Sequence, residues 1–511
     1  MAPVLKRVDS RSSDDTLIET VARSLERPLG DTEVSYFLPS RESGVNDMYL
    51  HLGFRAPPEI MRRNRVSLVW AILRLKHPLL ASRVEMHSYK DIRFVYMTPE
   101  SVLEALESAD ASLEYRSQTK DDLIDTYLNG PRTLANERLS YLIISQVEEQ
   151  EFDFLLCATH FLGDGMALHQ FANDFFSLLA SGRADEDLES MLTEEWYGRW
   201  GGNKHDSVGV SLPASLEERL PPMSPGRFCR AVSRVDYAKS QEKLIGGQSF
   251  PRRSGHPRKT VVPTISIDPE RTKQILKKCK AQSTSISSAM FAICNIAWAR
   301  TCNGSLELPT MMYSALNLRP VLTASKALND SYWYLCIGYF NVVLPSFIPH
   351  SGSDAEIEKI FWHRARVAKN QSARAAKSAM LVSRSYEMAL ERGQRARRFA
   401  REDDEKALGI WKAPPPSPPV ASNKPPSTAL IGLSLLGNLD GTYKHSAFPS
   451  VKLHTLTTGS RQRAAGMLLF AYTFVSRLWI SLGYDQGGFE PSTVERFWGN
   501  VVSAVDSDLL A

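Results

Sequence analysis

The segment around residue 160 constrains the fold of this chain more than any other part of it. Residues 152–159 (FDFLLCAT) are almost continuously apolar, which is typical of a strand buried on both faces of a sheet. The turn sequence HFLGDG follows at residues 160–165, and residues 166–180 then place apolar side chains at helical spacing. The sequence therefore predicts a buried strand, a tight turn and an amphipathic helix in direct succession.

The rest of the chain alternates between helix-like and strand-like segments, without an internal repeat. The spacing of apolar residues predicts helices at 58–76, 269–280, 285–301 and 491–507. Short β-like runs predict strands at 91–97, 139–147, 261–267, 310–316, 338–347, 429–437, 451–457, 467–475 and 478–484. This alternation is typical of an α/β protein.

The length of the chain indicates more than one domain. At about 150 residues per domain, 511 residues correspond to two or three domains. The periodic pattern lapses between residues 203 and 259, where six prolines accompany many charges, and we interpret this stretch as a crossover. We therefore expect an N-terminal domain at 1–210, a Pro-rich crossover at 211–259 and a C-terminal domain at 260–511.

Composition excludes several classes of protein. With 43% apolar and 23% charged residues the chain is neither wholly disordered nor fibrous, and a net charge of +4 argues against a nucleic-acid partner. The six cysteines form no CxxC pair, so we expect free thiols in a reducing compartment and no metal site. Neither a secretory signal nor a membrane-spanning segment is recognisable, and a cytoplasmic location is the expectation.

One predicted helix, at 354–405, is strongly basic. Between residues 359 and 401 it has twelve lysines and arginines against two glutamates. The charges can simply form a solvated face, or they can bind a phosphate-bearing ligand. Because aromatic residues are few among these charges and not regularly interleaved with them, a nucleic-acid role is the least supported interpretation. A second Pro-rich segment, at 412–427, follows this helix.

His160 is the strongest candidate for chemistry. A buried strand brings it to a tight turn, and a neutral imidazole there can take a proton from a hydroxyl or amine that attacks a carbonyl. The alternative is a histidine satisfied within the core. Asp164 precedes Gly165 and a helix, so a helix N-cap or an ion pair explains it better than direct catalysis does. A second HxxxD match, from His87 to Asp91, lies between two β-like runs and is interpreted as a hairpin turn.

HFLGDG resembles the HxxxDG motif of the chloramphenicol acetyltransferase-like superfamily. This group includes plant BAHD acyltransferases, peptide-synthetase condensation domains and fungal alcohol acetyltransferases of the trichothecene 15-O-acetyltransferase type. Further segments resemble the family in the same order along the chain: Ile72–Leu80, Ala315–Pro320 (ALNLRP), Gly338–Asn341, Ser434–Asp440 (SLLGNLD) and Leu482–Asp485. The resemblance spans roughly residues 28–508.

The resemblance implies two similar α/β domains with mixed sheets that meet along a channel. Coenzyme A would enter from one face and a small alcohol from the other, and the protein would act as a monomer with no bound cofactor. His160 would be the general base for direct attack on the thioester of acyl-CoA, with an acetyl group as the expected acyl group. The remaining implied site residues are Asp164 with its ion-pair partner Arg319, Gly165 and Asn317 as structural residues, and Asn438 and Tyr484 as substrate or coenzyme A contacts. From the basic helix, Arg395, Arg397 and Arg398 are expected to contact the phosphates of coenzyme A.

Two departures from the family pattern indicate which branch of the superfamily the chain resembles. The DFGWG segment of the BAHD group is absent, and Thr159 precedes His160 where condensation domains have a second histidine. Both favour the fungal alcohol acetyltransferase-like branch, with a small secondary metabolite such as a terpenoid as acceptor. A stand-alone condensation-type enzyme that uses a carrier-protein thioester and an inactive ligand-binding homologue remain alternatives. The sequence LIGGQS at 244–249 is similar to a carrier-protein site, but no apolar helix follows it.

Overall fold

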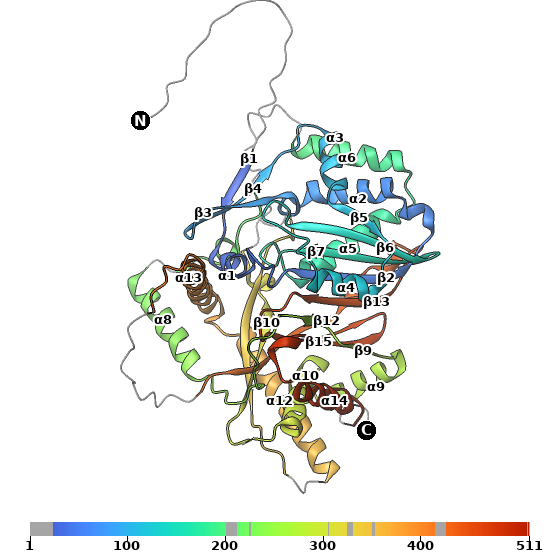
Figure 1. The fold of residues 1–511 in the computed structure, drawn as a ribbon. Coiled ribbons are helices and arrows are strands. Elements are labelled where there is room, and N and C mark those ends of the chain that lie inside the picture. The colour runs from blue at the N-terminus through green and yellow to red at the C-terminus, as the bar shows by residue number, and fades with distance from the viewer. Residues whose placement is uncertain are drawn as a thin grey trace, which may run out of the picture.

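The computed structural model describes residues 24–200, 212–223, 226–304, 306–323, 331–349, 353–413, 426–507 and 509. These residues form two halves, each built on a mixed sheet, which lie one above the other in Figure 1. The α/β fold class predicted from the sequence is confirmed.

The N-terminal half contains a five-stranded sheet in the order β13-β2-β7-β6-β5. These strands are β13 (Lys452–Ser460), β2 (Met48–Arg55), β7 (Glu151–Ala158), β6 (Ser140–Glu148) and β5 (Leu113–Arg116). β7 is the central strand, and residues 154–158 are all buried. The prediction of a strand covered on both faces is therefore confirmed.

Helices cover both faces of this sheet. On one face Phe154 packs against Phe175 and Phe176 of α5 (Gly165–Leu179), beside α2 (Arg63–Lys76). On the other face Leu155 packs with Tyr127 of α4 (Lys120–Asn129).

The remaining elements of this half are α1 (Asp31–Ser40), η1 (Pro58–Met61), η2 (Pro78–Ala81), α3 (Val102–Asp110), α6 (Asp185–Arg199), and a second sheet of β1 (Ser24–Pro28), β4 (Asp91–Met97) and β3 (Arg83–Ser88). The turn from β3 to β4 contains the second HxxxD match, which confirms its interpretation as a hairpin.

The C-terminal half contains a seven-stranded sheet. Its order is β11 (Ile337–Leu344), β10 (Thr310–Asn317), β12 (Ala429–Asn438), β14 (Met467–Phe474), β15 (Arg477–Asp485) and β8 (Thr260–Val261), with β9 (Thr264–Ile267) also paired to β15. The helices are α9 (Pro269–Ala281), α10 (Ile286–Thr301), α12 (Asp354–Ala376) and α14 (Pro491–Ser507), and short turns are η3 (Arg319–Val321), η4 (Leu439–Gly441), η5 (His445–Ala447) and η6 (Gln486–Gly488). α10 packs between α12 and α14 and is buried along most of its length, which explains its nearly continuous apolar sequence.

The C-terminal part of the chain contributes one strand to the N-terminal sheet. β13 follows β12 along the chain but pairs antiparallel with β2 of the N-terminal sheet, from Lys452 opposite Arg55 to Ser460 opposite Met48. The chain then returns to the C-terminal sheet for β14. The sheet that holds β7 is therefore completed by residues far along the chain.

The prediction of a single long helix at 354–405 is wrong. The structure has two helices there, α12 and α13 (Leu381–Ala407), and the helical hydrogen bonding stops at Lys377. The Ser378 hydroxyl accepts a hydrogen bond from the Met380 N–H, so a side chain replaces a backbone acceptor between the two helices. The helices also have different partners: α12 packs on α10 and β11, whereas α13 packs on α1 of the N-terminal half.

The crossover predicted at 203–259 is more ordered than the sequence indicated. It contains α7 (Leu216–Arg219) and the sixteen-residue helix α8 (Arg227–Glu242), which packs against α13. Residues 201–211 and 224–225 lie outside the described residues, as do residues 414–425 of the second Pro-rich segment. None of the helices in the described ranges is long and apolar enough to cross a membrane.

Candidate active site

His160 lies in the turn between β7 and α5, at the level where the two halves meet. The turn is closed by the Leu162 N–H, which donates to the Thr159 carbonyl over 3.1 Å. Asp164 ends the turn as the N-cap of α5, and its Oδ1 accepts hydrogen bonds from the N–H groups of Met166 (3.1 Å) and Ala167 (3.3 Å). The imidazole is thus carried on a backbone that is held at both ends.

The hydrogen bond made by His160 determines its tautomer. Nδ1 lies 3.2 Å from the carbonyl oxygen of Gly163, which can only accept, so Nδ1 carries the proton. Nε2 is then an unprotonated acceptor on a side chain that is partly exposed. Burial lowers the pKa of His160 below 6.5 and the positive charge of Arg392 adds to that, although hydrogen bonding to the backbone of His160 itself, the charge of Asp164 and the hydrogen bond to Gly163 oppose it. The imidazole is accordingly a neutral base at pH 7.

Asp164 is joined to the C-terminal half by its second carboxylate oxygen. Oδ2 accepts from Arg319 Nη1 and from the backbone N–H of Cys336, both over 2.9 Å. Asp164 is only 2% exposed, and burial of a carboxylate is costly unless it is paired and hydrogen-bonded. The interactions with Asp164 outweigh burial and raise the pKa of Arg319.

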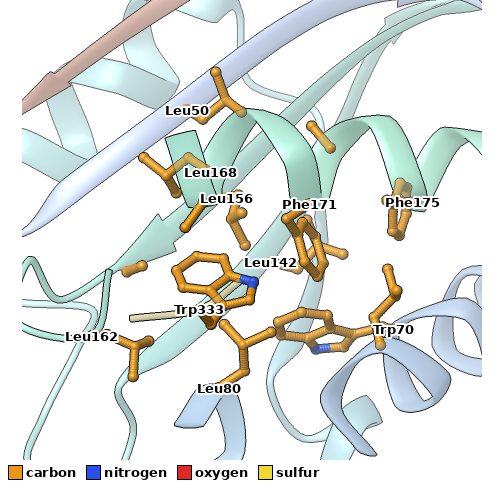
Figure 2. Packing of buried hydrophobic residues seen from close by; sticks show 14 of the residues in the cluster. Leu50, Trp70, Leu80, Leu142, Leu156, Leu162, Leu168, Phe171, Phe175 and Trp333 are labelled. Atoms are coloured by element: carbon orange, nitrogen blue, oxygen red, sulfur yellow. The ribbon is translucent and has the colours of Figure 1, made fainter. Parts of the chain in front are cut away.

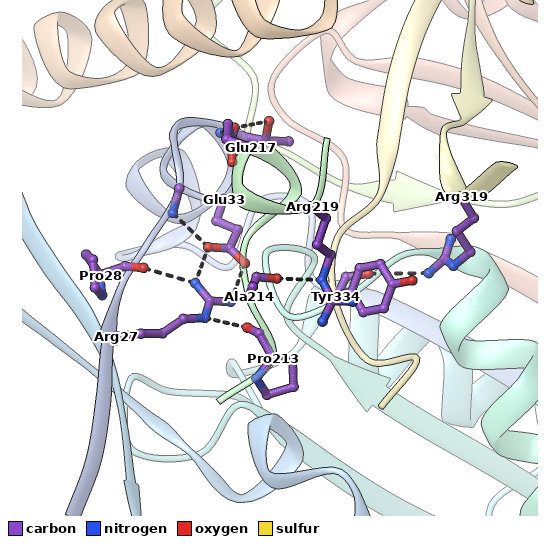
Figure 3. A network of polar contacts seen from close by, with 11 residues as sticks. Arg27, Pro28, Glu33, Pro213, Ala214, Glu217, Arg219, Arg319 and Tyr334 are labelled. Atoms are coloured by element: carbon purple, nitrogen blue, oxygen red, sulfur yellow. Dashed lines mark hydrogen bonds and ion pairs between the residues drawn. The ribbon is translucent and has the colours of Figure 1, made fainter. Parts of the chain in front are cut away.

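The segment around Arg319 holds its guanidinium in place. The Asn317 side-chain oxygen accepts from the Arg319 N–H over 3.0 Å, so Asn317 shapes the turn that carries the arginine. The guanidinium carbon lies 5.0 Å from the ring centroid of Tyr334, and Figure 3 shows this ring between Arg219 and Arg319. The ion pair therefore links the turn of His160 to a hydrogen-bonded turn of the other half.

The other side of His160 is lined by aromatic residues. The ring of Tyr36, from α1, lies 4.2 Å from the imidazole centroid, and its hydroxyl is hydrogen-bonded to that of Tyr339 in β11. Arg392 of α13 lies over both tyrosine rings, with its guanidinium carbon 4.5 Å from the Tyr339 centroid and 5.5 Å from that of Tyr36. Sequence reasoning missed Tyr36 because its local pattern is that of an ordinary short helix, and it included Arg392 only as one of twelve basic residues.

Solved structures supply the comparison, because no protein-family model and no curated protein matches this chain. The trichothecene 15-O-acetyltransferase TRI3 from Fusarium sporotrichioides matches with a TM-score of 0.73 and 13% identity, over 95% of each chain. Polyketide synthase associated protein 5 from Mycobacterium tuberculosis matches with a TM-score of 0.54 and 13% identity, over 94% of this chain and 98% of the other. The condensation domain of the monacolin K polyketide synthase MokA matches with a TM-score of 0.55 and 12% identity, over 94% and 97%.

The chain has the chloramphenicol acetyltransferase-like fold. The match covers both halves, so the resemblance predicted from the motifs extends to the whole architecture.

Within this fold Gly165 brings α5 close to the C-terminal sheet. A Cβ at Gly165 would lie 3.3 Å from the Leu436 side chain of β12, a distance tighter than most van der Waals contacts. His169, one turn further along α5, is fully buried and hydrogen-bonded to the Tyr443 hydroxyl over 2.9 Å. The structure therefore gives His169 a packing role.

The three arginines predicted to contact coenzyme A have carboxylate partners. Arg397 is bonded to Asp31 of α1 over 2.5 Å and to the Tyr89 carbonyl over 3.0 Å, so it anchors α13. Arg395 and Arg398 are more exposed and lie 3.6 Å and 3.8 Å from acidic residues one turn away. Among the described residues, the ion pairs of these three arginines are with Glu391, Asp31 and Glu402, and none of them is with His160, Tyr36 or Tyr339.

Asn438 and Tyr484 occupy positions that shape the sheet. The Asn438 side-chain oxygen accepts from the Asp440 N–H and from the Thr473 hydroxyl, which stabilises the turn after β12. Tyr484 is 9% exposed and packs in the core of the C-terminal half.

A cavity of about 840 Å³ lies away from His160. It is at the end of the β10–β11 pair where Thr310 faces Leu344, whereas Tyr339 is further along β11, opposite Ala315. Its lining is mostly apolar and consists of Gly304, Leu306, Glu307, Pro309 and residues 343–347.

Proposed function

We propose that the chain is an acyl-CoA-dependent O-acyltransferase in which His160 is the general base. The observation that supports this most directly is the state of the imidazole: Nδ1–H is used by the Gly163 carbonyl and Nε2 is unprotonated. Burial keeps the pKa of His160 below 6.5, so the ring is ready to accept a proton at neutral pH. The fold, shared with acyltransferases, favours a thioester as the acyl donor.

In this mechanism the acceptor hydroxyl donates a hydrogen bond to His160 Nε2. Its oxygen attacks the thioester carbonyl while Nε2 takes the proton, giving a tetrahedral oxyanion and an imidazolium. Collapse of the intermediate breaks the C–S bond and expels the thiolate of coenzyme A, which receives the proton from Nε2. The ester and free coenzyme A leave, and the imidazole is neutral again.

Asp164 serves this reaction as a positioning residue. Both of its oxygens are occupied, by two backbone N–H groups at the start of α5 and by Arg319 and Cys336 across the interface. His160 Nδ1 is bonded to a backbone carbonyl and not to a carboxylate, unlike the histidine of a serine-protease triad. Asp164 therefore fixes the turn and takes no part in proton transfer.

The test is release of free thiol from acetyl-CoA and longer acyl-CoAs by the full-length protein, screened against hydroxylated terpenoids. His160→Ala should reduce turnover by about 10²- to 10⁴-fold, the usual contribution of a general base. His87→Ala is the matched control, because His87 starts the other HxxxD sequence in an exposed hairpin. Full activity of His160→Ala would overturn the mechanism.

The identity of the donor has its own test. Activity that requires an acylated carrier protein and ignores free acyl-CoA would select a condensation-type enzyme instead. If the exposed arginines of α13 contact coenzyme A phosphates, reversing the charge of Arg395 and Arg398 should raise the KM for acyl-CoA and leave kcat unchanged. An unchanged KM would remove α13 from the donor site.

A further inference from the structure

The strap Ser331–Cys336 (SYWYLC) crosses below the turn of His160. Both of its ends are bound to the N-terminal half: Ser331 Oγ lies 2.9 Å from His77 Nδ1, and the Cys336 N–H donates to Asp164. In between, the Tyr332 hydroxyl donates to Asp174 of α5 over 2.8 Å. This segment lies between two motifs and has no periodic apolar pattern, so no sequence signal marks it.

Trp333 is the centre of the strap and is fully buried. Figure 2 shows its indole among Leu80, Leu162 and Phe171, and its ring centroid lies 5.9 Å from that of Phe171. Among the described residues no acceptor is within hydrogen-bonding distance of its Nε1.

The indole is in direct contact with the turn of His160. A Cβ at Gly163 would lie 2.8 Å from Cε3 and 3.1 Å from Cζ3 of Trp333, so only glycine allows the backbone to rest on this ring. The carbonyl of the same Gly163 accepts the Nδ1–H of His160. The contacts thus run from Trp333 through the backbone of Gly163 to the imidazole.

We propose that Trp333 is a positioning residue for His160, whose indole supports the Gly163 carbonyl and so keeps the imidazole in the tautomer with Nε2 unprotonated. Removing the ring leaves space below Gly163, into which the turn can sink. The carbonyl then moves away from Nδ1, and the Nε2–H tautomer, which is useless as a base, becomes populated. The kinetic consequence rests on the proposed function, whereas the tautomer is measurable without it.

The tautomer can be read from long-range ¹H–¹⁵N couplings in full-length protein labelled with ¹⁵N-histidine, with His160→Gln to assign the signal. The wild type should show the Nδ1–H form alone, and Trp333→Leu should show a mixture of the two tautomers. Trp70→Leu is the matched control: Trp70 is equally buried and packs on Phe171 at 5.4 Å, but its N–H donates to Ser112. It should leave the His160 signal unchanged.

A second variant changes the contact between Gly163 and Trp333 on the Gly163 side. Gly163→Ala places a methyl group against the indole and should also mix the tautomers, whereas the double variant Gly163→Ala/Trp333→Leu has room for that methyl and should lie closer to wild type than Gly163→Ala. If Trp333→Leu does not fold, the tautomer of His160 in Gly163→Ala is the test. A single Nδ1–H tautomer in the folded variants would overturn the inference.

Turnover separates positioning from general stability. Trp333→Leu should lower kcat by roughly 10- to 100-fold, as expected for a small misplacement of a catalytic group, with little change in KM. Trp333→Phe keeps a six-membered ring under Gly163 and should restore most of the loss. A protein in which the tautomer depends on Trp333 but no acyl transfer occurs would refute the proposed function and leave this inference standing.

Discussion

The phenol ring of Tyr36 lies against the imidazole of His160, with centroids 4.2 Å apart and the ring planes tilted by 32°. Tyr36 belongs to α1, and α1 is held in place by α13, through the Arg397–Asp31 ion pair and the close approach of Gly393 to Asp31. The C-terminal half therefore reaches the candidate base by two routes, the Asp164–Arg319 pair on one side and the α13–α1 contact on the other.

Replacing Tyr36 by leucine should impair turnover more than stability. Loss of an aromatic pair costs about 0.5–1.5 kcal/mol in unfolding free energy, whereas an imidazole free to tilt can lose up to about 10²-fold in kcat. Tyr36→Phe keeps the ring and removes only the hydroxyl contact with Tyr339. Steady-state kinetics should place Tyr36→Phe close to wild type. Equal impairment of both variants would assign the effect to the hydroxyl group.

Burial of His160 mainly sets the acid limit of activity, and the charge of Arg392 should shift it further. Only neutral His160 can accept a proton, so kcat/KM should fall as the pH drops through its pKa, which lies below 6.5. The charge of Arg392 contributes to lowering that pKa; Arg392→Gln should raise it and move the acid limb of kcat/KM to higher pH. Arg398→Gln, on the exposed side of α13, is the control and should leave the limb in place. If the acid limb of kcat/KM has the same position in Arg392→Gln as in the wild type, the charge of Arg392 does not affect the pKa of His160.

Asp164→Asn should destabilise the fold strongly. The asparagine oxygen can still cap α5, but its NH₂ group would face two donors, Arg319 Nη1 and the Cys336 N–H. Breaking a buried ion pair by removing one partner typically costs 3–5 kcal/mol, measurable by urea unfolding. Glu402→Gln disrupts the exposed pair with Arg398 and should cost no more than about 1 kcal/mol. Similar losses in the two variants would mean that the Asp164–Arg319 pair is no stronger than a surface pair.

Local patterns in the sequence predicted the parts of the site that are local in the chain. The strand β7, the turn and α5 follow from an apolar run, a glycine-containing turn and helical spacing, all within thirty residues. The need of a buried carboxylate for a partner, together with the family resemblance, also indicated Arg319. The break at Lys377 was missed because lysine, serine and alanine around it are all compatible with a helix, and the break depends on which half each helix packs against.

The rest of the site depends on pairing between distant residues. Tyr36 and His160, or β13 and β2, are brought together only by the packing of the two halves. The periodicity of apolar residues does not predict contacts between such distant parts of the chain. α8 was missed for a related reason: Phe228 and Val235 on it are 79% and 60% exposed, so its apolar pattern does not mark a buried face. The count of basic residues likewise hid the fact that Arg392, and not its exposed neighbours, faces the tyrosines next to His160.

His169 should make the fold sensitive to acid. Burial lowers its pKa to about 3, whereas in the unfolded chain it is about 6.5. His169 is neutral in both states above pH 6.5 and does not affect the free energy of unfolding there. As the pH falls from 6.5 towards 3, His169 binds a proton in the unfolded state only, which lowers the free energy of the unfolded state and so destabilises the fold. At pH 5 this destabilises the fold by about 2 kcal/mol relative to pH 7. His169→Gln should reduce the drop in unfolding free energy between pH 7 and pH 5 by that amount in urea titrations, while His87→Gln, in the exposed hairpin, should not. An unchanged drop in His169→Gln would mean that this histidine can be protonated within the folded protein.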